Sequence, residues 1–176
     1  MDTNNLKNIS LNGRVAYGIS CFENVLLSLK CDVSNWKMVL EYMWQFTSSQ
    51  DLEAWNDQIA EIIPENLLEF KTYEEHDFEY LEESQFKYLY GLYQNIDTKI
   101  SHIIRQIFYL GSSHSYSVII DYGQRSLEEL DKLIKFMVDN CFPLPDIEPF
   151  LKYSIEENKG WGNKFDGTVL SKILNQ

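Results

Sequence analysis

Cysteine, proline and glycine are scarce in this 176-residue chain, which contains three, four and eight of them. Cys21, Cys31 and Cys141 form no CxxC pair, and none of the three histidines stands at zinc-ligand spacing from them. We therefore expect reduced thiols, no disulfide framework and no metal or other cofactor. No Gly- or Ser-rich linker divides the chain, so residues 1–176 are predicted to form a single domain.

Long apolar runs are absent as well. No segment approaches the roughly 20 apolar residues that a membrane span needs. Asp2, Asn4 and Asn5 stand where a signal peptide would have a basic start and an apolar run. The sequence thus predicts a cytoplasmic protein without membrane attachment.

Basic residues are outnumbered, with 15 Lys and Arg against 27 Asp and Glu and a net charge of −12. Binding to nucleic acid or to an anionic membrane needs clustered Lys and Arg, which neutralise phosphates. Those two classes of partner are therefore excluded, and a basic or neutral partner is expected.

Familiar catalytic motifs are also missing, since the sequence has no P-loop, no HExxH and no GxSxG. A Cys–His nucleophile could still be assembled in space from Cys21 or Cys141 with His102 or His114. Cys21, however, lies among apolar residues at helical spacing, which favours a buried and inert thiol. The prediction is a protein that is not an enzyme.

Apolar residues recur at helical spacing in six longer segments, 12–29, 34–46, 51–63, 84–93, 97–110 and 126–138. Pro64 is expected to end the third segment, and Gly111 to follow the C-terminus of the fifth. Residues able to cap helices stand at the starts of most segments: Asn12, Ser34, Asp51, Asp97 and Ser126, the last in a capping box with Glu129.

The remaining segments are less regular. The apolar run from Tyr116 to Tyr122 fits a short strand or a buried helical turn equally well, so the structure of residues 114–123 stays open. Prolines and glycines after residue 142 predict an irregular C-terminal segment anchored by Trp161 and Phe165. The fold class is accordingly all-α, a single-domain helical bundle or short helical stack with a Pro/Gly-rich irregular C-terminal segment.

One acidic segment, residues 74–83, holds six carboxylates and no Lys or Arg, which is half of the net charge. Like charges this close repel, so they are kept either as a solvated loop or helix start, or as a surface for a cation-rich partner. Aromatic residues within it could form the centre of such an interface. The candidate partner-binding residues are Glu74, Glu75, Asp77, Phe78, Glu79, Tyr80, Glu82 and Glu83.

Two stretches carry a resemblance to a known family, NGRVAYGISCFENVL (residues 12–26) and ENKGWGNKFDG (residues 157–167). Together they resemble the small, acidic, mainly helical immunity proteins of bacterial polymorphic-toxin and contact-dependent growth inhibition systems. That resemblance implies a cytoplasmic antidote that binds the C-terminal domain of a cognate toxin, often a basic nuclease. The resemblance identifies no functional residues in this chain, so the candidate partner-binding residues of the acidic segment are inferred from charge. The alternative is a helical scaffold or regulatory adaptor that binds a peptide or protein in a groove between helices.

Overall fold

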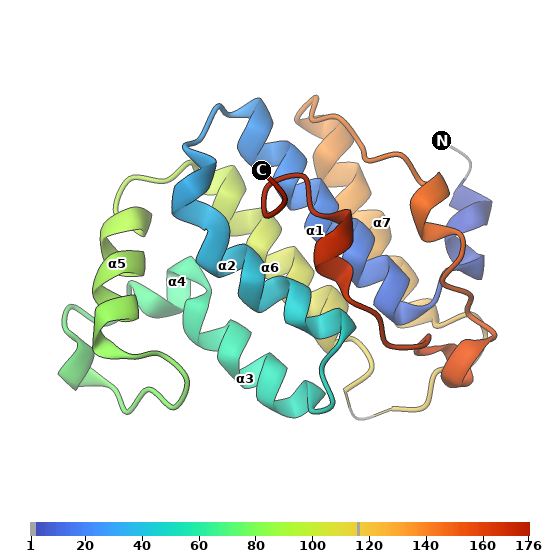
Figure 1. Cartoon of the computed structure of the whole chain (residues 1–176), viewed down its shortest axis with the longest axis horizontal. Helices are drawn as coiled ribbons and strands as arrows, with labels where there is room; N and C mark the ends of the chain where they lie inside the picture. The colour runs from blue at the N-terminus through green and yellow to red at the C-terminus, as the bar shows by residue number, and fades with distance from the viewer. Residues whose placement is uncertain (1–2, 116) are drawn as a thin grey trace.

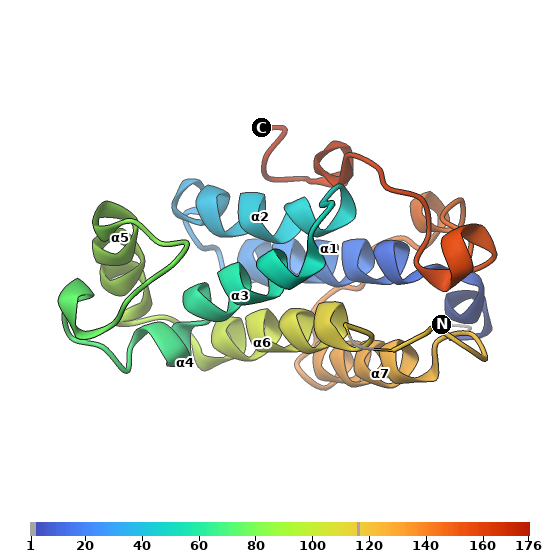
Figure 2. The ribbon, with the colours of Figure 1, turned by 90° about the horizontal axis from the view of Figure 1, so that it is seen from below.

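A single helix, α1 (Leu11–Ser28), runs through the middle of the molecule, and the other elements surround it in the computed structural model (Figure 1). The structure describes residues 3–115 and 117–176. Seen from below, α2 (Lys37–Trp44) lies on one side of α1, and α6 (Thr98–Ser112) and α7 (Gln124–Asp139) lie on the other (Figure 2). The fold is thus a stack of helices with α1 as its inner layer.

The remaining regular elements of the described chain are helical as well. The other α-helices are α3 (Leu52–Ile62), α4 (Pro64–Leu67) and α5 (Glu83–Tyr93). Short 3₁₀ turns lie before, between and after the α-helices: η1 (Thr3–Asn8), η2 (Val33–Trp36), η3 (Gln45–Thr47), η4 (Tyr73–Glu75), η5 (Glu148–Phe150), η6 (Glu157–Gly160) and η7 (Gly167–Leu170). Within residues 3–115 and 117–176 there is no sheet, only one antiparallel bridge between Ile9 and Ser154. This confirms the all-α prediction and the irregular C-terminal segment.

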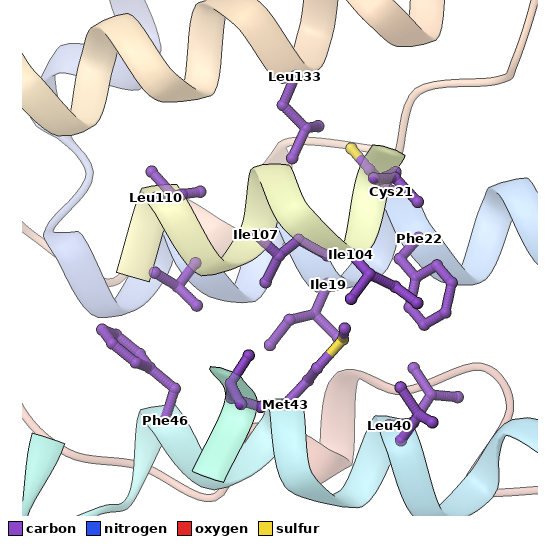
Figure 3. Packing of buried hydrophobic residues seen from close by; sticks show 14 of the residues in the cluster. Ile19, Cys21, Phe22, Leu40, Met43, Phe46, Ile104, Ile107, Leu110 and Leu133 are labelled. Atoms are coloured by element: carbon purple, nitrogen blue, oxygen red, sulfur yellow. The ribbon is translucent and has the colours of Figure 1, made fainter. Parts of the chain in front are cut away.

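The core is one hydrophobic cluster to which all the long helices contribute. Ile19 of α1 and Met43 of α2 lie opposite Ile104 and Ile107 of α6 at its centre (Figure 3). Trp36, Trp44 and Trp55 are buried in the same cluster. Burial of this apolar surface is the main force that holds the helices together.

Because α1 is buried from Leu11 to Leu26, its polar side chains need partners inside the protein. Ser10, rather than Asn12, caps the helix, and its Oγ accepts from the Gly13 N–H at 3.3 Å. Asn12 instead donates through Nδ2 to the carbonyls of Gly162 and Asn163, both at 3.3 Å. A residue expected to begin the helix therefore fastens the C-terminal segment to it.

Arg14 is fully buried and faces no carboxylate in any of its hydrogen bonds. Burial lowers its pKa to about 10, so the guanidinium remains charged at neutral pH. It donates five hydrogen bonds of 2.6–3.3 Å, to the carbonyls of Leu6, Lys7, Tyr122 and Gly123 and to Ser126 Oγ.

The loop held by Arg14 includes residues predicted to form either a short strand or a buried helical turn, and both predictions are wrong for its described part. Residues 117–120 form neither a strand nor a helical turn, and Tyr116 lies outside the described residues. Asp121, Tyr122 and Gly123 follow with φ of 47°, 61° and 66°, a left-handed run that only specific contacts stabilise. Ile119 alone of the apolar residues here is buried, while Val118 and Ile120 are 73% and 68% exposed.

Glu23, also fully buried, connects α1 with the C-terminal segment and with α2. Its carboxylate accepts from the Ser171 hydroxyl at 2.5 Å, the Lys172 N–H at 2.6 Å and Trp44 Nε1 at 3.1 Å. Nearby, the Lys172 ammonium donates to Asn24 Oδ1 at 2.9 Å. The last residues of the chain are therefore fixed against α1.

Several predicted helix boundaries are confirmed. Asp51 and Asp97 accept backbone hydrogen bonds at the starts of α3 and α6. α3 ends at Ile62, two residues before Pro64, which instead occupies the first position of α4.

Other boundaries were predicted wrongly, because they depend on contacts distant in sequence. Ser34 is not the cap before α2; Asp32 caps η2 and accepts from the Ser34 N–H at 3.1 Å. Ser126 lies inside α7, which begins at Gln124, and its hydroxyl is buried against Arg14. Gly111 lies inside α6, where a Cβ would stand 2.6 Å from the Trp55 ring.

A pair of glycine substitutions tests this packing. Gly111→Ala should lower the free energy of unfolding by about 1–3 kcal/mol, because the added methyl collides with Trp55. Gly91→Ala in α5, where an added Cβ would meet nothing within 4 Å beyond its chain neighbours and the adjacent helix backbone, should raise it by about 0.5–1 kcal/mol. Urea denaturation measures both, and a stabilised Gly111→Ala variant would contradict the close approach.

A substitution at Arg14 tests the link between α1 and the loop. Arg14→Lys keeps the charge but cannot supply five donors, so we expect a loss of roughly 2–4 kcal/mol of stability. Amide exchange in residues 117–123 should rise more than elsewhere. Arg125→Lys, at an exposed position, is the matched control and should change neither quantity.

Candidate functional site

The acidic segment, residues 74–83, runs from the last two residues of η4 through a loop to the first residue of α5, at the end of the molecule where α3, α4 and α5 meet (Figures 1 and 2). Its six acidic residues are all exposed. The carboxylates are thus hydrated at the surface, as their clustering predicts, and they form one negatively charged face.

The backbone of this loop is held by a seventh carboxylate, Glu61 of α3. Its two oxygens accept from the N–H groups of Glu79, Tyr80 and Leu81 at 2.7, 3.0 and 2.9 Å. The Tyr73 hydroxyl donates to the Leu81 carbonyl at 2.9 Å. Such charge-assisted bonds fix the loop conformation without help from a bound partner.

Three of the six carboxylates have roles within the fold. Glu82 caps α5 in a reciprocal capping box with Gln85. Glu83 forms an ion pair with Lys87, and Glu75 accepts from the Lys71 N–H at 2.8 Å.

The other three carboxylates, on Glu74, Asp77 and Glu79, make no such capping or ion-pair contact. A backbone hydrogen bond and the Thr72 hydroxyl lower the pKa of Glu74, which keeps it ionised. These three contribute exposed charge without capping a helix or forming an ion pair with another described residue.

The aromatic residues of the segment only partly face solvent. Phe78 is half-buried and stacks on Tyr73, with ring centroids 5.3 Å apart, and it also contacts Phe86 at 5.2 Å. Tyr80 is half-buried as well. Phe78 thus anchors the loop through ring contacts while the carboxylates stay at the surface.

Beside the loop lies a cavity of about 240 Å³, called the aromatic cavity below. Its walls come from the acidic segment, α3 and the residues around α4. Two carboxylates and three aromatic rings contribute to the lining, and no Lys or Arg does. The lining residues are Ala60, Glu61, Asn66, Glu69, Phe70, His76 and Phe78.

The residues considered for nucleophilic chemistry have other surroundings. Cys21 is fully buried, and burial raises the pKa of its thiol well above the ordinary value, which makes it a poor nucleophile. His102 is exposed and stacks on Phe136, with ring centroids 4.4 Å apart.

His114 is buried, and burial lowers its pKa. Its Nδ1 lies 3.3 Å from Ser117 Oγ. Within residues 3–115 and 117–176, no three His, Cys, Asp or Glu side chains are arranged to hold a metal ion.

Sequence reasoning missed a second surface feature, the apolar loop at residues 117–122. Val118 and Ile120, which the sequence allowed in either a short strand or a buried helical turn, border a cavity of about 430 Å³ together with His114 and Arg125. An apolar run normally indicates burial, so only the position of Arg14 and the left-handed backbone reveal this exposure.

Comparison with known proteins adds no relative. No protein-family model matches the chain, and neither the curated proteins nor the solved structures contain a match. In the described part of the chain, none of the helices has the length and apolar character needed to cross a bilayer. Function must therefore be inferred from the geometry.

Removing the Glu61 carboxylate tests whether it fixes the acidic segment. In Glu61→Ala, three N–H groups lose their acceptor, so amide exchange at residues 79–81 should accelerate and stability should fall by about 1–3 kcal/mol. Asp57→Ala removes an exposed carboxylate from the same helix and should leave that exchange unchanged. Equal exchange in both variants would contradict a structural role for Glu61.

Proposed function

We propose that this protein is an immunity protein, a cytoplasmic antidote that binds and neutralises the basic C-terminal domain of a cognate toxin, such as a nuclease. The observation that carries the proposal is the preformed acidic loop, whose backbone is fixed by Glu61 while Glu74, Asp77 and Glu79 stay exposed. A surface already in its bound shape loses little entropy on association.

Electrostatics supports this function. A toxin that acts on nucleic acid must present Lys and Arg to phosphates. Carboxylates on a rigid loop can take the place of those phosphates and cover the same face. The net charge of −12 also steers a cationic partner toward the protein and raises the association rate, which suits an inhibitor that must act before the toxin does.

A second candidate function, a peptide-binding adaptor, is favoured by one observation, the exposed loop at 117–122. Val118, Ile120 and Tyr122 are 73%, 68% and 57% exposed, which is unusual for apolar side chains so close together. An adaptor of this kind would bind through apolar contacts, so its affinity would change little with salt. Salt dependence therefore separates the two functions.

The primary test is binding to the C-terminal domain of the protein encoded immediately upstream, at low and high salt. We expect tight binding that weakens as salt rises. Replacing Glu74, Asp77 and Glu79 together by Lys should raise the low-salt Kd by about 10–100-fold, mainly through a slower association rate.

The matched control reverses three exposed acids elsewhere, Asp131, Glu148 and Glu156, so the net charge changes equally. If both triple variants lose the same affinity, the acidic segment has no specific role. Salt-insensitive binding abolished by Ile120→Ser would favour the adaptor instead, and no binding in either salt would remove the proposed toxin as partner.

A further inference from the structure

The aromatic cavity beside the acidic segment has a geometry suited to one kind of side chain. Phe70 and His76 stack nearly parallel, with centroids 4.5 Å apart and an interplanar angle of 14°. Phe78 stands nearly perpendicular to both rings, at 85° and 82°. The three rings therefore form a corner, against which a flat group can lie.

The charges in the cavity select the sign of that group. Glu61 brings a carboxylate whose position is fixed by three backbone N–H donors, and Glu69 adds an exposed one. An anion would be repelled, and an uncharged apolar group would leave Glu61 poorly solvated beside it. A cation is attracted both by the carboxylates and by the faces of the rings.

The shape further distinguishes arginine from lysine. A guanidinium is planar, stacks on aromatic faces and can bond a carboxylate through two N–H groups, whereas an ammonium is a compact and strongly hydrated charge. At about 240 Å³ the cavity suits a single side chain rather than a segment of structure.

We propose that the aromatic cavity binds the guanidinium of one arginine side chain on the surface of the basic partner. This inference rests on the proposed function, because the arginine is supplied by the protein that the acidic segment attracts. The rings and Glu69 contact the guanidinium, and Glu61 adds its fixed charge. The acidic segment then attracts the partner at long range, and the adjacent cavity recognises its arginine at short range.

The direct test needs no partner, which separates it from the test of function. The intact protein is titrated with the peptide Ac-Gly-Arg-Gly-NH₂ while the aromatic NMR signals of Phe70, His76 and Phe78 are followed. We expect saturable shifts with a dissociation constant on the order of millimolar, as for a single weak contact. The citrulline peptide, of similar shape but uncharged, should bind at least about fivefold more weakly, and the lysine peptide about two- to fivefold.

Two variants connect these shifts with the cavity. Glu69→Gln changes an exposed position, and Phe78→Leu keeps an apolar side chain. Each should raise the dissociation constant for the arginine peptide by about two- to tenfold. Glu156→Gln makes the same chemical change as Glu69→Gln. It directly precedes η6 in the segment at the opposite end of the molecule (Figure 1), and it should have no effect.

Equal shifts with arginine and citrulline, shifts that map away from the three rings, or no shift at all would overturn the arginine site. If that occurs while the charge-reversed variant still loses the partner, the proposed function stands and only the cavity assignment fails. If the peptide binds but the toxin domain does not, the cavity assignment stands and the proposed partner is wrong.

Discussion

The desolvation of α1 is the constraint on which the rest of the structure depends. A helix buried on every side cannot leave a charged or amide group without partners, since water is unavailable to replace them. Asn12, Arg14 and Glu23 find those partners in loops far away in sequence. Two irregular parts of the molecule, the loop at residues 117–123 and the C-terminal segment, are held by polar side chains of its most buried helix.

The same principle explains how the surface charge is organised. Inside the protein each charge is matched by neutral donors or acceptors, so none of the acidic surplus is consumed there. The surplus collects at the end formed by α3, α4 and α5, where repulsion between carboxylates would loosen an ordinary loop. Glu61 offsets this by bonding the loop backbone rather than its side chains, so order and exposed charge coexist.

Much of the fold was predictable because local signals and packing agree. Asp51 and Asp97 cap helices whose apolar stripes face the core, and the acidic segment is exposed as its repulsion requires. Prediction failed where a distant contact overrides a local preference. Gly111 lies against the Trp55 ring instead of following a helix end. Val118 and Ile120 face outward in the loop whose end Arg14 holds. The role of Glu61 has no local signature at all.

The bonds between α1 and the C-terminal segment also govern the order in which the molecule can form. Asn12 and Glu23 bond residues 148 to 151 positions further along the chain. A ribosome adding about 5–20 residues per second needs on the order of ten seconds to supply those partners after α1 emerges. Until then the Glu23 carboxylate and the Asn12 amide lack their hydrogen-bond partners from the C-terminal segment. The central helix therefore cannot be fully buried in the core. The native state is thus reached only after Ser171 and Lys172 have been synthesised, and it forms more slowly than in helical proteins built from local contacts.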